Sequence, residues 1–186
     1  MSGNLPLFKK SKVDRLVKAG DAAGLIAVIN GPNPARERAD AVHELPRFSE
    51  EVEAHHKDAA RAAMVSAAQD PDPEVRCSAL FAVSEFGLED AAEHLVTGTD
   101  DSEWMVRVFA VTLLGRFREE RSVARLGAVL ANDVEGMVRE AAASSLGGLG
   151  DSSALEPLRR ASAEDPDREV RKAAKRSVKQ LEANSA

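Results

Sequence analysis

Apolar residues recur along the chain at the spacing of one helix face, in a frame that is set by an arginine. Around Arg139, Val138 lies one residue before the arginine and Ala142 three residues after it, and Leu146 and Leu149 follow at seven and ten residues. This spacing puts the four apolar side chains on one side of a helix. The frame occurs four times in full, each time with an Asp six residues before the arginine: at Arg76, Arg107, Arg139 and Arg171.

A turn and a second short amphipathic segment follow the arginine-bearing helix in the first three full copies. The second segment has a leucine nineteen residues after the arginine: Leu95, Leu126 or Leu158. Each unit is therefore predicted to be a pair of helices of about 12 residues each. Consecutive arginines are 31, 32 and 32 residues apart, and such a period is typical of a solenoid, because a small helix pair can bury its apolar face only against neighbouring pairs. We predict an all-α fold, an α-solenoid of stacked antiparallel helix pairs with about five repeats and N-terminal capping helices.

The first unit is a weaker copy of the frame, with Arg36 as its arginine and Ala35 where the full copies have Val. Its first helix is expected at 35–45. Arg36 lies 40 residues before Arg76, so this unit is longer than the others. We expect the extra residues in a longer second helix at about 49–68, with Ser49 as its N-cap.

Two short helices are expected before the repeats, at 11–19 and 21–29, as a capping unit for the end of the stack. We predict three segments: an N-terminal arm at 1–10, a single solenoid domain at 11–182 and a tail at 183–186. The arm's apolar residues serve either as an anchor on the first helix or as a short motif for a partner. The last helix carries basic residues where a further repeat would pack, either as a solubilising cap or as a patch for an acidic partner: Lys172, Lys175, Arg176 and Lys179.

The repeated frame resembles HEAT repeats, and within them the short repeats of the phycobilin lyase type. The resemblance depends on the Asp-to-Arg spacing of six, the Val-Arg pair and, in the third full copy, the turn at 148–151 and the segment at 154–158. It covers about residues 30–182. It implies a ladder between neighbouring repeats, in which the planar arginine fork binds the Asp carboxylate or the carbonyl ends of a turn. We therefore expect a structural rather than catalytic role for Asp70, Arg76, Asp101, Arg107, Asp133, Arg139, Asp165 and Arg171.

The resemblance also implies that the second helices line a concave, partner-binding side. The outward residues of these helices run from acidic to basic along the stack, which suits a protein ligand of mixed charge. Trp104 is a further candidate, because Trp is enriched in binding hot spots, although it could instead fill a gap beside a neighbouring turn. The candidate partner-binding residues are Asp90, Glu93, His94, Trp104, Arg121, Arg125, Glu156 and Arg160.

Charge and composition narrow the class of partner. The net charge is −6, and residues 49–103 alone carry 14 acidic and 3 basic side chains. This acidic belt argues against nucleic acid, which requires a continuous basic track. The prediction is a non-catalytic scaffold or adaptor that binds another protein. The alternatives are a subunit of a bilin lyase-like enzyme and a nucleic-acid-binding HEAT-like protein.

Catalytic, metal and membrane chemistry find little support in the sequence. No Ser-His-Asp set and no glycine-rich phosphate loop occurs, and adjacent His55 and His56 point about 100° apart on a helix, which does not suit one metal ion. We therefore expect no cofactor and no metal. The single Cys77 cannot form an internal disulfide, and no signal peptide or 18-residue apolar run is found, so we expect a cytoplasmic protein without a membrane span.

Overall fold

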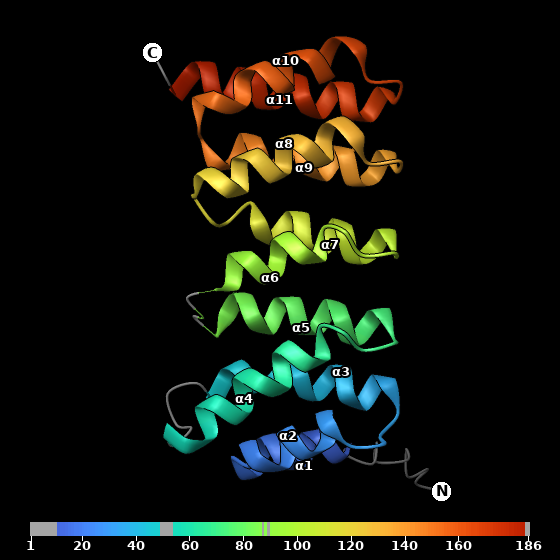
Figure 1. Cartoon of the computed structure of the whole chain (residues 1–186), viewed down its shortest axis with the longest axis vertical. Coiled ribbons are helices and arrows are strands. Elements are labelled where there is room, and N and C mark those ends of the chain that lie inside the picture. Colours follow the sequence, from blue (N-terminus) through green and yellow to red (C-terminus); the bar gives the residue numbers. More distant parts are fainter. Residues whose placement is uncertain (1–10, 49–53, 87, 89, 185–186) are drawn as a thin grey trace, which may run out of the picture. The chain divides into compact units, whose positions relative to one another are not determined.

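The computed structural model describes residues 11–48, 54–86, 88 and 90–184, and within the first turns of the fourth helix it describes only the backbone. All secondary structure in the described residues is helical, which confirms the predicted all-α solenoid class (Figure 1). The elements are α1 (Lys12–Ala19), α2 (Ala22–Asn30), α3 (Ala35–Glu44), the 3-10 helix η1 (Leu45–Phe48), α4 (Ala54–Ala67), α5 (Pro73–Glu85), α6 (Ala91–Gly98), α7 (Trp104–Leu114), α8 (Glu120–Asn132), α9 (Gly136–Leu149), η2 (Ser152–Ala154), α10 (Leu155–Glu164) and α11 (Arg168–Asn184).

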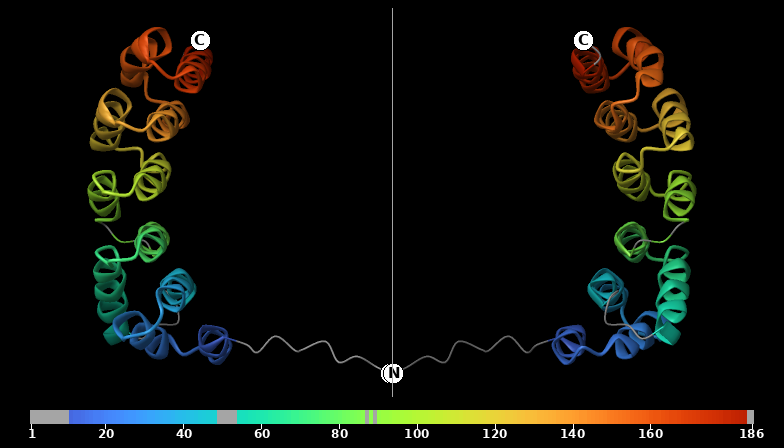
Figure 2. Two further views of the ribbon diagram at one scale, coloured as in Figure 1. Left: turned by 90° about the vertical axis from the view of Figure 1, so that its right-hand side faces the viewer. Right: turned by 90° about the vertical axis from the view of Figure 1, so that its left-hand side faces the viewer.

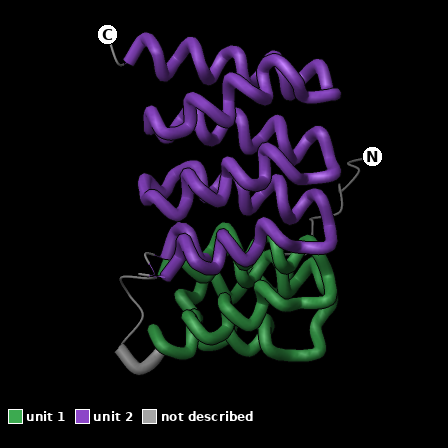
Figure 3. The backbone as a smooth tube through the Cα atoms, turned by 45° about the horizontal axis from the view of Figure 1, so that its top comes forward, with its two compact units in different colours: residues 1–82 green, residues 83–186 purple. Residues whose placement is uncertain are grey.

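The chain divides into two compact units, residues 1–82 and 83–186, with the boundary inside α5 (Figure 3). Each unit is described separately below. The prediction of one continuous domain at 11–182 stays a prediction. At the C-terminal end, α11 continues to Asn184.

The first unit begins with the two predicted capping helices. Ser11 caps α1: its hydroxyl accepts from the N–H of Asp14 at 3.0 Å, and the Asp14 carboxylate accepts from the N–H of Ser11 at 2.9 Å. This reciprocal pair satisfies two backbone donors that a helix start leaves open. Gly20 ends α1 with φ of 67°, a left-handed conformation that favours glycine. Asp21 caps α2 by accepting from the N–H of Gly24 at 2.7 Å.

The remainder of the first unit is the long first repeat. Its first helix, α3, is followed directly by η1, and the second helix, α4, begins at Ala54. The predicted N-cap Ser49 lies outside the described residues, as do the side chains of His55 and His56.

In the second unit, the helices form two layers (Figure 2). The arginine-bearing helices α7, α9 and α11 form one layer, in which α9 packs against both of the others. The second helices α6, α8 and α10 form the other layer, in which α8 packs against both of its neighbours. We call these the first-helix layer and the second-helix layer.

The core of each repeat lies between the two layers. The valine before each ladder arginine is buried at Val106, Val138 and Val170, and the leucines of the second helices are fully buried. Burying one such leucine stabilises a fold by about 2 kcal/mol relative to leaving it exposed. The stack therefore holds together through many similar aliphatic contacts, with little aromatic packing, as the 4% aromatic content predicts.

Neighbouring first helices approach one another closely at a serine and a glycine. The Ser177 hydroxyl on α11 donates to the Ala143 carbonyl on α9 at 2.8 Å, and a Cβ added to Gly147 would lie 2.7 Å from the Ser177 Cβ. The same contact joins α9 to α7 one repeat earlier, through Ser145, Val111 and Gly115. This second inter-repeat contact was not predicted from the sequence.

Candidate protein-binding surfaces

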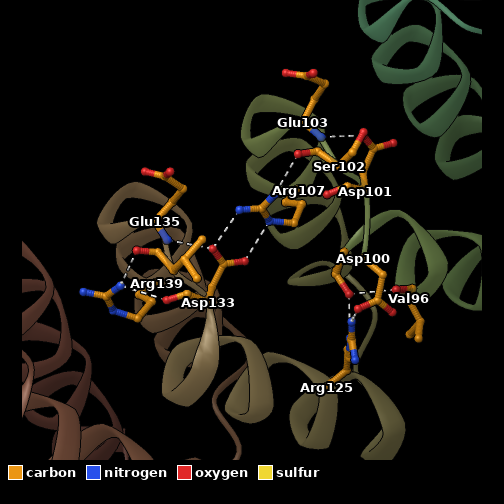
Figure 4. Close-up of polar contacts among 12 residues, drawn as sticks. Val96, Asp100, Asp101, Ser102, Glu103, Arg107, Arg125, Asp133, Glu135 and Arg139 are labelled. Atoms are coloured by element: carbon orange, nitrogen blue, oxygen red, sulfur yellow. Dashed lines mark hydrogen bonds and ion pairs between the residues drawn. The ribbon is translucent and has the colours of Figure 1, made fainter.

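The Asp–Arg ladder is present and is structural. In the second unit, Nε and Nη2 of Arg107 donate to the two oxygens of Asp133 at 2.8 and 2.9 Å, while Nη1 donates to the Asp101 carbonyl at 3.0 Å (Figure 4). Each arginine thus binds the carboxylate of the next repeat and the turn of its own repeat. Arg139 repeats this geometry with Asp165, at 2.9 and 3.0 Å.

Both ladder pairs of the second unit lie largely out of water. Burial, the largest single influence, raises the pKa of Asp165, but hydrogen bonds from Arg139 and from the Asp167 N–H, together with the nearby positive charges, outweigh it and hold that pKa below its usual value. The pKa of Asp133 is likewise raised by burial and, more strongly, lowered by hydrogen bonds from Arg107 and the Glu135 N–H and by nearby positive charges. These four groups are therefore committed to holding adjacent repeats together.

The last ladder arginine, Arg171, has a different environment. Its Nη1 donates to the carbonyls of Asp165 and Pro166 at 2.6 and 3.0 Å, as in the other repeats. Within the part of the chain that the structure describes, no carboxylate approaches its Nε or Nη2. Lys175 and Lys179 are exposed on the same helix, at the positions that Ala143 and Gly147 occupy on α9.

The arginine assigned to the first repeat from its sequence, Arg36, does not take part in the ladder. Arg36 is exposed, and the ladder position is filled by Arg38, whose Nε and Nη2 donate to Asp70 at 2.9 and 2.7 Å. Nη1 of Arg38 donates to the carbonyl of Asn33. The apolar frame follows Arg38 as well: the residues three, seven and ten positions later, Ala41, Leu45 and Phe48, are all buried.

The predicted partner-binding residues fall into two separate groups. Seven of them belong to the second-helix layer, whereas Trp104 is the first residue of α7, in the first-helix layer. The structure therefore does not bring Trp104 together with the others. In the second-helix layer, Glu93, Arg121, Glu156 and Arg160 are exposed, and Asp90, His94 and Arg125 are half-buried.

Arg125 also has a structural task. Its Nε donates to the Thr99 hydroxyl at 2.5 Å, and its Nη2 pairs with Asp100 at the end of α6 (Figure 4). Thr99 is buried and in turn donates to the Val96 carbonyl at 2.7 Å. Arg125 therefore connects α8 to α6, and replacing it would disturb the fold as well as any binding.

Two grooves run between consecutive helices of the second-helix layer. The groove between α8 and the turn that follows α6 has a volume of about 380 Å³ and is lined by Asp100, Arg125 and Asn132 among others. The groove between α8 and α10 has a volume of about 430 Å³ and includes Gly127 and Arg160. Each groove ends at a ladder pair, so the repeat provides two similar polar recesses side by side.

Large exposed apolar side chains gather on the first-helix layer. Among the described residues these are Trp104, Met105 and Phe109 on α7, Val134 in the turn before α9, and Met137 on α9. We call this set the apolar patch. The sequence analysis singled out Trp104 alone.

The described residues show no arrangement typical of a metal site or a membrane span. No group of three or more His, Cys, Asp or Glu side chains within the described ranges could hold a metal ion. None of the described helices has both the length and the apolar character needed to cross a bilayer.

Comparisons with known proteins agree with this geometry. The family model for HEAT repeats matches residues 22–107 and 93–179. No curated protein sequence matches the chain significantly. Among solved structures, the chain is similar to the complex of CpcE and CpcF of phycocyanin lyase from Nostoc sp. PCC7120, with 20% identity over 97% of this chain and 70% of that chain and a TM-score of 0.67.

Two further structures are similar in fold. Human deoxyhypusine hydroxylase is 22% identical over 92% of this chain and 77% of that chain, with a TM-score of 0.57. A computationally designed armadillo repeat protein for modular peptide recognition is 16% identical over 90% and 85% of the two chains, with a TM-score of 0.55. At these identities the likeness concerns the fold alone. The family match spans most of the sequence and coincides with the observed helix pairs, and the chain belongs to the HEAT-repeat family.

Proposed function

We propose that this chain is a non-catalytic scaffold that binds another protein through its second-helix layer. The observation that carries the proposal is the pair of adjacent grooves of about 380 and 430 Å³ in that layer. Repeated grooves of similar size suit an extended partner that contacts successive repeats in the same way. The fold similarity to a designed peptide-recognition protein supports the same class of function.

Exposed charges of the second-helix layer favour a partner of mixed charge. Exposed Glu93 lies on α6, exposed Arg121 on α8 and exposed Arg160 on α10, beside the second groove. A partner with basic groups near α6 and acidic groups near α8 and α10 would be complementary, and complementary charges mainly select the partner and speed its association. Arg159 on α10 is paired with Glu182 at 2.7 Å and Arg121 with Glu119 at 2.6 Å. Both therefore contribute less to such a surface than Arg160, which takes part in no ion pair among the described residues.

Charge reversal of two exposed arginines of the second-helix layer tests the proposal. Wild-type protein and the double variant Arg121→Glu with Arg160→Glu are immobilised, retained proteins are identified by mass spectrometry, and the binding of the best candidate is then measured with purified components. Lys175→Glu, an exposed charge reversal in the other layer, is the matched control. We expect binding to be weakened at least tenfold by the double variant and unchanged by the control. Equal binding by all three proteins would exclude this surface.

The alternative functions are separated by two assays on the same samples. A visible absorption band after incubation with a free bilin would favour a lyase-like subunit, for which the fold similarity to the CpcE and CpcF complex is the supporting observation. A salt-sensitive gel shift with DNA or RNA that is lost in Lys175→Glu would favour nucleic-acid binding. Either result, without a protein partner, would overturn the scaffold proposal.

A further inference from the structure

The apolar patch lies on two neighbouring repeats, mainly on the first-helix layer, and its Val134 also lines the groove of about 380 Å³. Val134 is 85% exposed, Met137 60%, Met105 52%, and Trp104 and Phe109 38% each. The inward side of α7 is formed by other residues, including the buried Val106, Ala110 and Leu114. The patch is therefore additional to the core of these repeats.

The fold does not require apolar side chains at these positions. Met105 and Met137 both lie two residues before their ladder arginines, and the same position holds Glu74 in α5 and Glu169 in α11. Glutamate is thus compatible with the same helix start in two other repeats of this chain. Large exposed apolar groups that stability does not demand commonly mark an interaction surface.

Acidic side chains lie at the edge of the patch. Glu103 directly precedes Trp104, and Glu135 lies between Val134 and Met137 in sequence. Both are exposed, and within the described residues neither carboxylate takes part in an ion pair; Figure 4 shows both side chains extending away from the ladder. Their backbone N–H groups donate to the ladder aspartates at 2.9 Å, which fixes where these side chains leave the backbone.

We propose that the apolar patch binds an amphipathic segment of a partner protein in which large apolar residues are flanked by Lys or Arg. Apolar contacts with Met105 and Met137 provide the area, and methionine adapts readily to the shape of a bound segment. Glu103 and Glu135 pair with the flanking basic groups and select against acidic segments. An anionic membrane surface would be repelled by the same carboxylates, and so would the matching patch of a second copy in a two-fold dimer, because like charges would meet.

The test uses Trp104 as its reporter, because it is the one tryptophan of the chain. The probe is a Trp-free peptide of about 18 residues, with leucines on one helix face and lysines on the other. One control peptide has glutamate in place of lysine, and another has the same composition in scrambled order. We expect the lysine probe to shift the Trp104 emission to shorter wavelength and to bind at least tenfold more tightly than either control peptide.

Variants then assign the binding to the patch. Met105→Glu with Met137→Glu introduces the residue that stands at this position in two other repeats, so folding is expected to be retained and is checked by circular dichroism. We expect at least a tenfold loss of affinity, whereas Ser144→Glu, on the exposed face of α9 beyond the patch, changes it less than twofold. Glu103→Lys with Glu135→Lys leaves the apolar groups in place, and we expect it to reverse the preference toward the glutamate peptide.

Several outcomes would overturn the proposal. The first is equal affinity for the scrambled and ordered peptides, and the second is full affinity in the double-glutamate variant. The third is salt-sensitive binding that is the same in wild type, in Ser144→Glu and in both patch variants. Tighter binding by a peptide of residues 1–10 of this chain than by the lysine probe would assign the patch to self-association instead. None of the substituted residues lines either groove, so the result of these variants does not depend on the second-helix grooves.

Discussion

Removing the carboxylate of a ladder pair should destabilise the stack far more than removing a surface pair. In Asp165→Ala, the Arg139 fork loses two charged hydrogen bonds of 2.9 and 3.0 Å, and the Asp167 N–H loses its acceptor at 2.8 Å. The two side chains are only 11% and 5% exposed, so water replaces these contacts poorly. Breaking one side of a buried, hydrogen-bonded ion pair typically destabilises by about 3–5 kcal/mol, and we expect about 3 kcal/mol here.

The matched control is Glu85→Ala, which also removes a carboxylate that pairs with an arginine of the next repeat. Arg116 and Glu85 approach to 2.5 Å, but their side chains are 56% and 35% exposed. Exposed pairs of this kind contribute about 0–1 kcal/mol. Both substitutions delete one carboxylate and one inter-repeat ion pair. Asp165 is the more buried of the two and accepts three hydrogen bonds where Glu85 accepts one, so the comparison measures what burial and full bonding add to such a pair.

Urea unfolding followed by circular dichroism gives the free energy of unfolding for each variant. Because repeat proteins can unfold in part, amide hydrogen exchange of α11 is measured alongside, and we expect Asp165→Ala to increase exchange there first. Replacing both partners, Arg139→Met with Asp165→Leu, should recover much of the loss, since no charge is then left buried and unpaired. If Asp165→Ala loses no more stability than Glu85→Ala, the ladder is not a principal contact between repeats.

Two further predictions concern the same repeats. Gly147→Ala should destabilise the protein by about 1–3 kcal/mol through overpacking against Ser177, whereas Gly148→Ala, with open space around it, should stabilise it by about 0.5–1 kcal/mol. Thermal unfolding of both variants tests this, with Ser177→Gly as the change that should rescue Gly147→Ala. Equal effects of the two glycine substitutions would contradict the close contact. The stability of the fold should also fall in acid, because folding lowers the pKa values of Asp133 and Asp165. The stability that these two carboxylates give is present above their ordinary pKa of about 4. It is lost as the pH falls through their lower folded-state pKa values. Urea titrations between about pH 5 and 2 should show this loss in wild type and a smaller loss in a variant with Asn at both positions.

The fold was predictable because its period is simple. A helix repeats every 3.6 residues, so the positions at one before and at three, seven and ten after each arginine necessarily share a face. Val138, Ala142 and Leu146 are accordingly buried. The ladder also followed from the spacing and the resemblance, since an arginine fork requires a planar acceptor near a turn.

In the first repeat, the sequence pattern led to the wrong arginine. Apolar Ala35 precedes Arg36, where the full copies have Val, whereas Glu37 precedes Arg38. The three apolar positions that follow Arg38 fit the frame better than those that follow Arg36, where His43 and a proline occur. The core positions after the arginine therefore identify the register more reliably than the residue before it, because they are buried between the two helices of the pair.

Surface contacts between repeats were harder to predict from the sequence. Arg125 reaches Thr99 and Asp100 from a helix 25 or more residues away in the chain, and this pairing does not recur at the same frame position in other repeats. A contact made once gives no periodic signal, so only the three-dimensional arrangement reveals it. The apolar patch, in contrast, did leave a signal: Met105 and Met137 replace the glutamate found at the same position in two other repeats.

The turns before the ladder arginines separate the acids that build the stack from those that are free to recognise a partner. In the second unit, the arginine of the preceding repeat neutralises Asp133 and Asp165, each six residues before its own arginine. The acid two residues later, such as Glu135, contributes its backbone N–H to the ladder and keeps its carboxylate in solvent. Part of the negative charge of these turns is therefore cancelled within the stack. The rest stays exposed to solvent, at the same position in successive turns. Since the position two residues before the arginine is exposed as well, a change there can alter the partner of a repeat without altering its packing, which makes it the place where repeats of one stack can differ in function.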